Sequence, residues 1–185
     1  SLTELIESLY SEFARLKDTP RHVRETFETK ISAFTTGEYL LGCFIQYPET
    51  WDWAKNSLSD VDFEGDQNRL YKHIENIYNT SRKPGEDIFR NLPEEFQEKA
   101  RVLALFSEAQ NGDLPYDGIL EEVKHAVKKF LAEKREEKKR QVHNQIKEAE
   151  LARDHRAIQK LLSEYQLLLN TPHDEEVQKI HNASL

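Results

Sequence analysis

Cysteine and long apolar runs are scarce in this chain, and each shortage limits what the protein can be. Cys43 is the only cysteine in 185 residues, which excludes an intrachain disulfide and a cysteine-cluster metal site. The longest apolar run, Tyr39 to Ile45, is much too short to cross a bilayer. Because no charged-then-apolar leader is recognisable either, we expect a cytoplasmic protein without membrane contact.

Strand patterns and catalytic motifs are missing as well. No segment alternates apolar and polar residues for long enough to form a β-strand, and all six prolines stand where a helix could begin. The sequence contains no glycine-rich phosphate loop, no G-x-S-x-G and no H-E-x-x-H. These absences predict an all-α protein that is not an enzyme by itself and needs no cofactor.

A metal site is not expected. Glu122-x-x-His125 has the spacing of a metal-binding pair, but the second copy that a carboxylate-bridged di-metal bundle requires is missing. We therefore expect Glu122 and His125 to be solvated. Cys43 is interpreted as a small buried residue, because no base that would activate a nucleophile is evident.

Apolar residues recur at helical spacing along the chain and divide it into four parts. Residues 1–34 carry the stripes of two amphipathic helices, and residues 35–132 predict a globular helical bundle. Residues 133–170 predict a connecting helix and a hairpin, and residues 171–185 a short tail helix. Within the bundle, the most apolar segment is Glu38 to Tyr47, where Gly42 is expected to permit close approach of another helix.

The stretch from Tyr116 to Asn170 connects the predicted bundle to the predicted hairpin. Its first half carries an apolar stripe, which stops over Glu133 to Gln141, where no side chain is apolar, and resumes at Val142. After a tight reversal near Asp154 a second helix returns. The pattern predicts a long helix that leaves a packed body, crosses water and ends in a separate two-helix lobe: a multi-helix globular bundle, a long connecting helix and a C-terminal helical hairpin.

This hairpin should leave apolar surface exposed. Pairing of its two helices can bury one stripe of apolar side chains. Leu167, Leu168 and Leu169, however, are consecutive and point in three directions. Contiguous exposed apolar surface marks a binding site, so we interpret the hairpin as an arm that docks on another protein. The alternative is that it folds back on its own body.

Charge is distributed unevenly. The whole chain has a net charge of −8, yet Lys124 to Asn170 holds twelve Lys and Arg against seven Asp and Glu, so the remainder carries −13. The overall acidity argues against a nucleic-acid-binding protein. An acidic body with a basic arm favours an acidic or mixed partner for the arm.

In the order of its motifs, the chain resembles the C-terminal helicase-binding domain of bacterial DnaG-type primase from about Gly37 to Asn170. The first signature is Glu38-x-Leu40-Leu41-x-x-Phe44-Ile45-x-x-Pro48-Glu49, followed by Asp62-Phe63, Arg69-Leu70-Tyr71 and Ile74. The second is Glu148-Ala149-Glu150 and the reversal at Asp154, followed by the apolar stripe of the returning helix. The family has glycine before the aspartate of the reversal, where this chain has Arg153.

The resemblance implies a helical subdomain built like the N-terminal domain of the hexameric replicative helicase, and a hairpin that docks on the N-terminal collar of that helicase. It allows single-stranded DNA-binding protein as a second partner, with little or no direct contact to nucleic acid. The parent protein would be a primase, and residues 1–34 the end of its catalytic region. The implied contact residues are Arg153, Arg156, Ile158, Leu161, Leu162, Tyr165, Leu168 and Leu169.

Two other functions remain open at this point. The chain also fits the N-terminal domain of the replicative helicase itself, which shares the architecture. A nucleic-acid-binding helical module would use the basic stretch Lys124 to Arg140, although Glu133, Glu136 and Glu137 interrupt that stretch.

Overall fold

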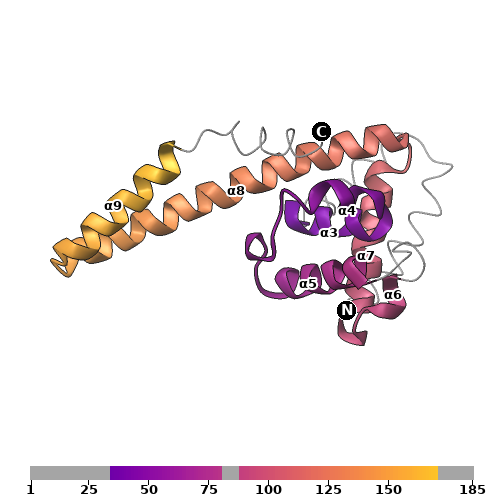
Figure 1. The fold of residues 1–185 in the computed structure, drawn as a ribbon, viewed down its shortest axis with the longest axis horizontal. Helices are drawn as coiled ribbons and strands as arrows, with labels where there is room; N and C mark the ends of the chain where they lie inside the picture. Colours follow the sequence, from indigo (N-terminus) through magenta and orange to yellow (C-terminus); the bar gives the residue numbers. More distant parts are fainter. Residues whose placement is uncertain (1–33, 81–87, 171–185) are drawn as a thin grey trace, which may run out of the picture.

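The computed structural model describes residues 34–80 and 88–170, and all regular structure within these ranges is helical. A compact body is followed by one long helix, which projects from it and pairs with a returning helix to form an arm (Figure 1). This architecture confirms the predicted all-α bundle with a long connecting helix and a C-terminal hairpin. The helices expected within residues 1–33 and 171–185 lie outside the described residues.

The helices follow one another with short connections. Their bounds are α3 (Thr36–Gln46), α4 (Glu49–Ala54), the 3₁₀ helix η1 (Asp60–Asp62), α5 (Gly65–Thr80), α6 (Ile88–Asn91), α7 (Glu94–Asn111), α8 (Tyr116–Leu151) and α9 (His155–Asn170). Pro48, Pro93 and Pro115 each stand directly before a helix, as the sequence predicts, because proline lacks the N–H that a first turn cannot use.

Helix α3 is the centre of the body. Leu40, Leu41 and Phe44 are completely buried, as expected for the most apolar segment of the chain. A capping box opens the helix: the backbone N–H of Glu38 donates to Thr35 Oγ1 at 3.2 Å, and the backbone N–H of Thr35 donates to Glu38 Oε2 at 3.1 Å. Thr35 is therefore the N-cap residue of α3.

Gly42 allows α3 and α7 to approach each other closely. A Cβ atom added at Gly42 would lie 2.2 Å from the backbone oxygen of Leu103 and 3.3 Å from Cβ of Ser107. Neither contact can be relieved by rotating a long side chain, because one partner is backbone and the other is a Cβ atom. The close approach that the sequence predicts at Gly42 is thus confirmed.

Aromatic contacts join α8 to the rest of the body. Phe63 stacks on Tyr71 of α5 with ring centroids 4.7 Å apart, and it meets Phe130 of α8 at 4.9 Å. The first half of α8 is therefore part of the core.

The two tryptophans of α4 differ in burial. Trp51 is 3% exposed, whereas Trp53 is only partly buried, as expected for residues on opposite helix faces.

Two expected helix ends are wrong. Glycine at position 112 predicts a left-handed end for α7, but its φ of −59° is right-handed, and its N–H donates to the carbonyl of Glu108 as in a further helical turn. The residue type of Asp66 predicts the N-cap of α5, yet Asp66 lies inside the helix, which already begins at Gly65 with a φ of +55°.

Replacing Gly42 by alanine should destabilise the body, because the new methyl group forces α3 and α7 apart. We expect a loss of about 1–3 kcal/mol in the free energy of unfolding, measured by urea denaturation. Gly118→Ala is the matched control: a Cβ at that position in α8 meets nothing closer than 3.5 Å, so alanine should stabilise by about 0.5–1 kcal/mol. Equal effects of the two substitutions would contradict the close contact at Gly42.

Candidate functional site

One continuous helix is shared by the body and the arm. Helix α8 runs for 36 residues without a break (Figure 1). Its first half buries Val123, Val127 and Phe130, and its second half buries Val142 and Ile146. The arm is therefore held by helix geometry and not by a flexible linker.

The charged segment from Glu133 to Gln141 does not cross water over its whole length, because residues at both of its ends contact other parts of the protein. Thr36 Oγ1 donates to Glu133 Oε1 at 3.2 Å, and Lys134 Nζ pairs with Glu64 of the body at 2.7 Å. Lys138 already pairs with Glu164 of α9 at 3.2 Å. The prediction that all nine residues cross water is wrong, because α9 is long enough to run back beyond Val142.

Paired capping hydrogen bonds make the reversal between α8 and α9. The N–H of Asp154 donates to the carbonyl of Ala149 at 2.9 Å, and the N–H of Arg153 donates to the carbonyl of Glu150 at 3.1 Å. Asp154 then caps the N-terminus of α9, since its Oδ1 accepts from the N–H of Ala157 at 3.0 Å. The reversal therefore satisfies backbone groups of both helices within three residues.

Arg153 occupies the left-handed position of this reversal. Its φ is +54°, a value that glycine adopts without strain and that costs an L-residue about 1–2 kcal/mol. The backbone thus has the geometry that glycine would favour, although the residue is arginine. Arg153 and the nearby Arg156 are both exposed, so the arm ends in two guanidinium groups.

The apolar side chains of α9 divide into a seam and a flank. The seam residues, each partly buried, follow helical spacing: Ile158, Leu161, Tyr165 and Leu168. Leu162 and Leu169, one heptad apart, lie beside this seam and are 45% and 56% exposed. None of the residues of α9 is fully buried. The returning helix thus pairs with α8 and still leaves an apolar edge in water.

Two exposed leucines of the arm lie outside the set implied by the resemblance. Leu151, in the last turn of α8, is 87% exposed, and Leu167 is 70% exposed on the face of α9 opposite the seam. Both depart from the apolar stripe of their helix, which is the sequence signal that identifies them. Of the eight implied residues, four are therefore exposed, namely Arg153, Arg156, Leu162 and Leu169, whereas the four seam residues lie against α8.

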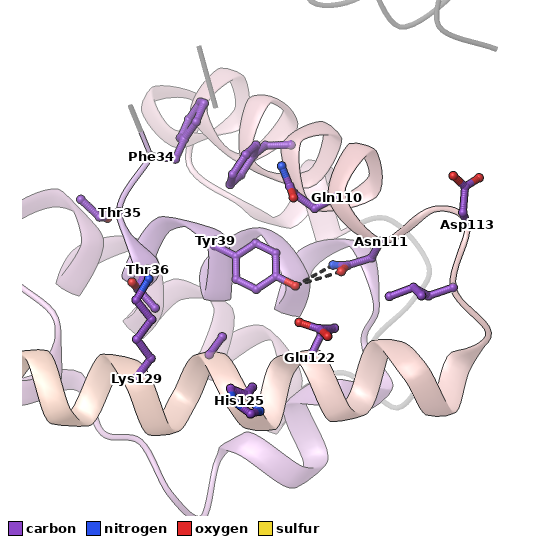
Figure 2. A pocket seen from close by; sticks show the side chains of 13 residues that line it. Phe34, Thr35, Thr36, Tyr39, Gln110, Asn111, Asp113, Glu122, His125 and Lys129 are labelled. Carbon is purple, nitrogen blue, oxygen red and sulfur yellow. Dashed lines mark hydrogen bonds between the residues drawn. The ribbon is translucent and has the colours of Figure 1, made fainter. Parts of the chain in front are cut away.

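The body contains a separate open cavity of about 580 Å³ between α3, α7 and the start of α8 (Figure 2). Tyr39 and Asn111 hold its floor together: Tyr39 Oη donates to Asn111 Oδ1 at 3.0 Å, or accepts from Asn111 Nδ2 at 2.8 Å. Glu122 and His125 lie on its α8 side and are exposed, as the sequence predicts. In the described ranges, no three His, Cys, Asp or Glu side chains are grouped to hold a metal.

Burial keeps the groups beneath this cavity neutral. Desolvation raises the pKa of the Cys43 thiol to about 12, although hydrogen bonds with Tyr39 and Asn111 act in the opposite direction. Desolvation also raises the pKa of the Tyr39 hydroxyl, and the neighbouring Cys43 and Glu122 add to the effect. Neither group therefore has the depressed pKa that activates a thiol or hydroxyl nucleophile.

Arg153→Gly should stabilise the arm, because glycine removes the strain of the left-handed conformation. The gain is reduced by the larger unfolded-state entropy of glycine, and we expect a net effect of about 0.5–1 kcal/mol. It would be measured as about twofold to fivefold slower amide exchange in α9. Ala152→Gly is the control, since Ala152 has a right-handed φ of −77°, and it should speed the exchange. Faster exchange in Arg153→Gly would refute strain at the tip.

Cys43 should not react with a thiol-disulfide exchange reagent in the folded protein at pH 8, because a pKa of about 12 leaves almost no thiolate and the side chain is completely buried. The unfolded chain in urea should react at once. Leu151→Cys, at the exposed arm tip, gives the matched native control and should be labelled rapidly at one site. Labelling of native Cys43 at the rate seen in urea would contradict this assignment.

Comparisons with known proteins identify no relative: no family model matches the chain, and no curated protein or solved structure matches it significantly. Within the described ranges, no helix is both long enough and apolar enough to cross a membrane.

Proposed function

We propose that this chain is a protein-interaction module whose arm docks on the N-terminal collar of a hexameric replicative DNA helicase, in the manner of the helicase-binding domain of bacterial primase that its sequence resembles. The observation that carries the proposal is the apolar edge of α9. Leu162 and Leu169 remain about half exposed on an arm that projects from the body (Figure 1).

The apolar edge has a physical cost that a partner would remove. Fully burying a leucine side chain contributes about 1.5–3 kcal/mol, and contiguous apolar surface on a soluble protein marks a contact site. The seam beside it, which includes Ile158 and Tyr165, is only partly buried against α8. A partner helix laid along this edge would complete the burial of the seam and of the flank together.

Charge at the arm tip favours a partner with acidic groups around an apolar surface. Arg153 and Arg156 are exposed beside Leu151, and Lys160 lies one turn further along α9. Guanidinium groups bind carboxylates in a paired, planar geometry, which gives an interface orientation as well as attraction. These charges would steer the arm, and the leucines would provide most of the affinity.

The ion pairs of α8 favour a protein partner over nucleic acid. Lys124 pairs with Glu121 and Lys139 with Glu136, each at 2.7 Å, and Lys134 and Lys138 pair with Glu64 and Glu164. Phosphate groups would have to compete with these carboxylates, so the stretch from Lys124 to Arg140 offers a weaker anion site than its sequence suggests.

In the proposed setting the module itself makes no primer. It would belong to a cytoplasmic primase, place that enzyme beside the unwinding helicase and so couple primer synthesis to unwinding. Single-stranded DNA-binding protein is a further candidate partner.

Leu162→Ala combined with Leu169→Ala should weaken binding to the cognate helicase about 100-fold or more, because both side chains would lose their contact in the interface. The measurement is isothermal titration of the full 185-residue chain into the helicase hexamer. Helicity by circular dichroism should not change, since neither side chain is buried in the free protein.

Leu167→Ala is the matched control, because it removes the same atoms from the opposite face of α9. It should change the affinity by less than about threefold. Unchanged helicase affinity in the double variant would overturn the proposed docking edge, and no binding by the unaltered chain would overturn the choice of partner.

A further inference from the structure

The open cavity of the body brings an aromatic ring and a carboxylate together. Tyr39 of α3 lines the cavity and is held in place by Asn111, which is 2% exposed and lies 3.0 Å from the tyrosine hydroxyl. In Figure 2 the Tyr39 ring is seen face-on, with the Glu122 side chain of α8 beside it. Burial raises the pKa of the Tyr39 hydroxyl, and Glu122 adds to the rise because its negative charge is close.

The carboxylate of Glu122 is not neutralised by the cations around it. Lys124 pairs with Glu121 at 2.7 Å, and Lys129 lies 3.8 Å from Glu133. In the part of the chain that the structure describes, Glu122 forms no ion pair with a Lys, Arg or His side chain. Because the face of an aromatic ring is itself electronegative, Glu122 and the tyrosine ring together attract a cation.

A planar guanidinium group fits these features better than other charged groups do. It stacks flat on an aromatic face and donates two parallel N–H bonds to one carboxylate. The side-chain oxygen of Gln110, which also lines the cavity, can accept a further N–H (Figure 2). The volume of about 580 Å³ is sufficient for an arginine side chain. An anionic ligand would be repelled by Glu122 and by Asp113, which lines the same cavity.

We infer that this cavity binds a guanidinium group, which stacks on the ring of Tyr39 and pairs with the carboxylate of Glu122. An arginine side chain of another protein and free arginine both carry this group, and they differ only in what is attached to its far end. The body then has a binding site of its own, separate from the arm. The inference is independent of the partner proposed for the arm.

Titration of the full chain with Nα-acetyl-arginine amide, followed by proton–nitrogen correlation NMR, tests this site. The amide signals of Tyr39, Asn111 and Glu122 should shift and saturate with a dissociation constant of about 1 mM or below. The uncharged isostere Nα-acetyl-citrulline amide should give no saturable shift. Nα-acetyl-lysine amide should bind at least about fivefold more weakly, because an ammonium group has no planar pair of donors. Free arginine distinguishes the two sources: affinity equal to that of the capped compound indicates a protein side chain, and at least about tenfold tighter binding indicates the amino acid.

Glu122→Gln should weaken binding of the capped arginine about tenfold or more, because the hydrogen bonds lose their charged acceptor. Glu122 is exposed, so the variant should fold normally. Glu121→Gln is the matched control, since it removes the neighbouring carboxylate, which already pairs with Lys124, and it should change the affinity by less than about twofold. Unchanged affinity in Glu122→Gln, equal binding of the citrulline compound, or no saturable shift with any arginine compound would each overturn the inference.

Discussion

The continuity of α8 is the constraint on which the rest of the structure depends. Val123, Val127 and Phe130 hold its first half in the body, and Val142 and Ile146 belong to the hairpin on its second half. Because an α-helix fixes the rotation and rise between any two of its residues, the direction of the arm follows from the packing of the body. Without this helix, the hairpin would have no defined position relative to α3 and α7.

Polar contacts at the point where α8 leaves the body add to the restraint on the arm's direction. The ion pair between Lys134 and Glu64 and the hydrogen bond from Thr36 to Glu133 lie directly beyond the Phe63–Phe130 contact. Exposed ion pairs of this kind contribute only about 0–1 kcal/mol each, so they refine the arm's position while the aromatic packing holds it.

The arm concentrates features that a self-contained fold would avoid. Leu151, Leu162 and Leu169 expose apolar surface, and Arg153 adopts a left-handed conformation that glycine would adopt without strain. Local departures from the usual rules are concentrated where function requires them. Their presence together on the projecting part of the molecule supports the proposal that the arm binds a partner, while the well-packed body supports the arm.

Much of this architecture follows from the sequence alone. Helical spacing predicts the buried face of α3, the length of α8 and the reversal at Asp154, because periodicity and capping residues act locally. The same local signals predict the close approach at Gly42. The left-handed cap predicted at Gly112 is wrong, because the Gly112 N–H continues the helical hydrogen bonding to Glu108.

What the sequence determined by itself is therefore which residues are helical and which face of each helix is apolar. Only the tertiary structure decided how far α9 runs back along α8, which shortened the predicted crossing from Glu133 to Gln141, and which leucines stay exposed once the seam forms. It also decided that the ring of Phe34 stacks on Phe106 of α7. The physical reason is that periodicity depends on neighbours along one helix, whereas exposure depends on which other helix lies against it.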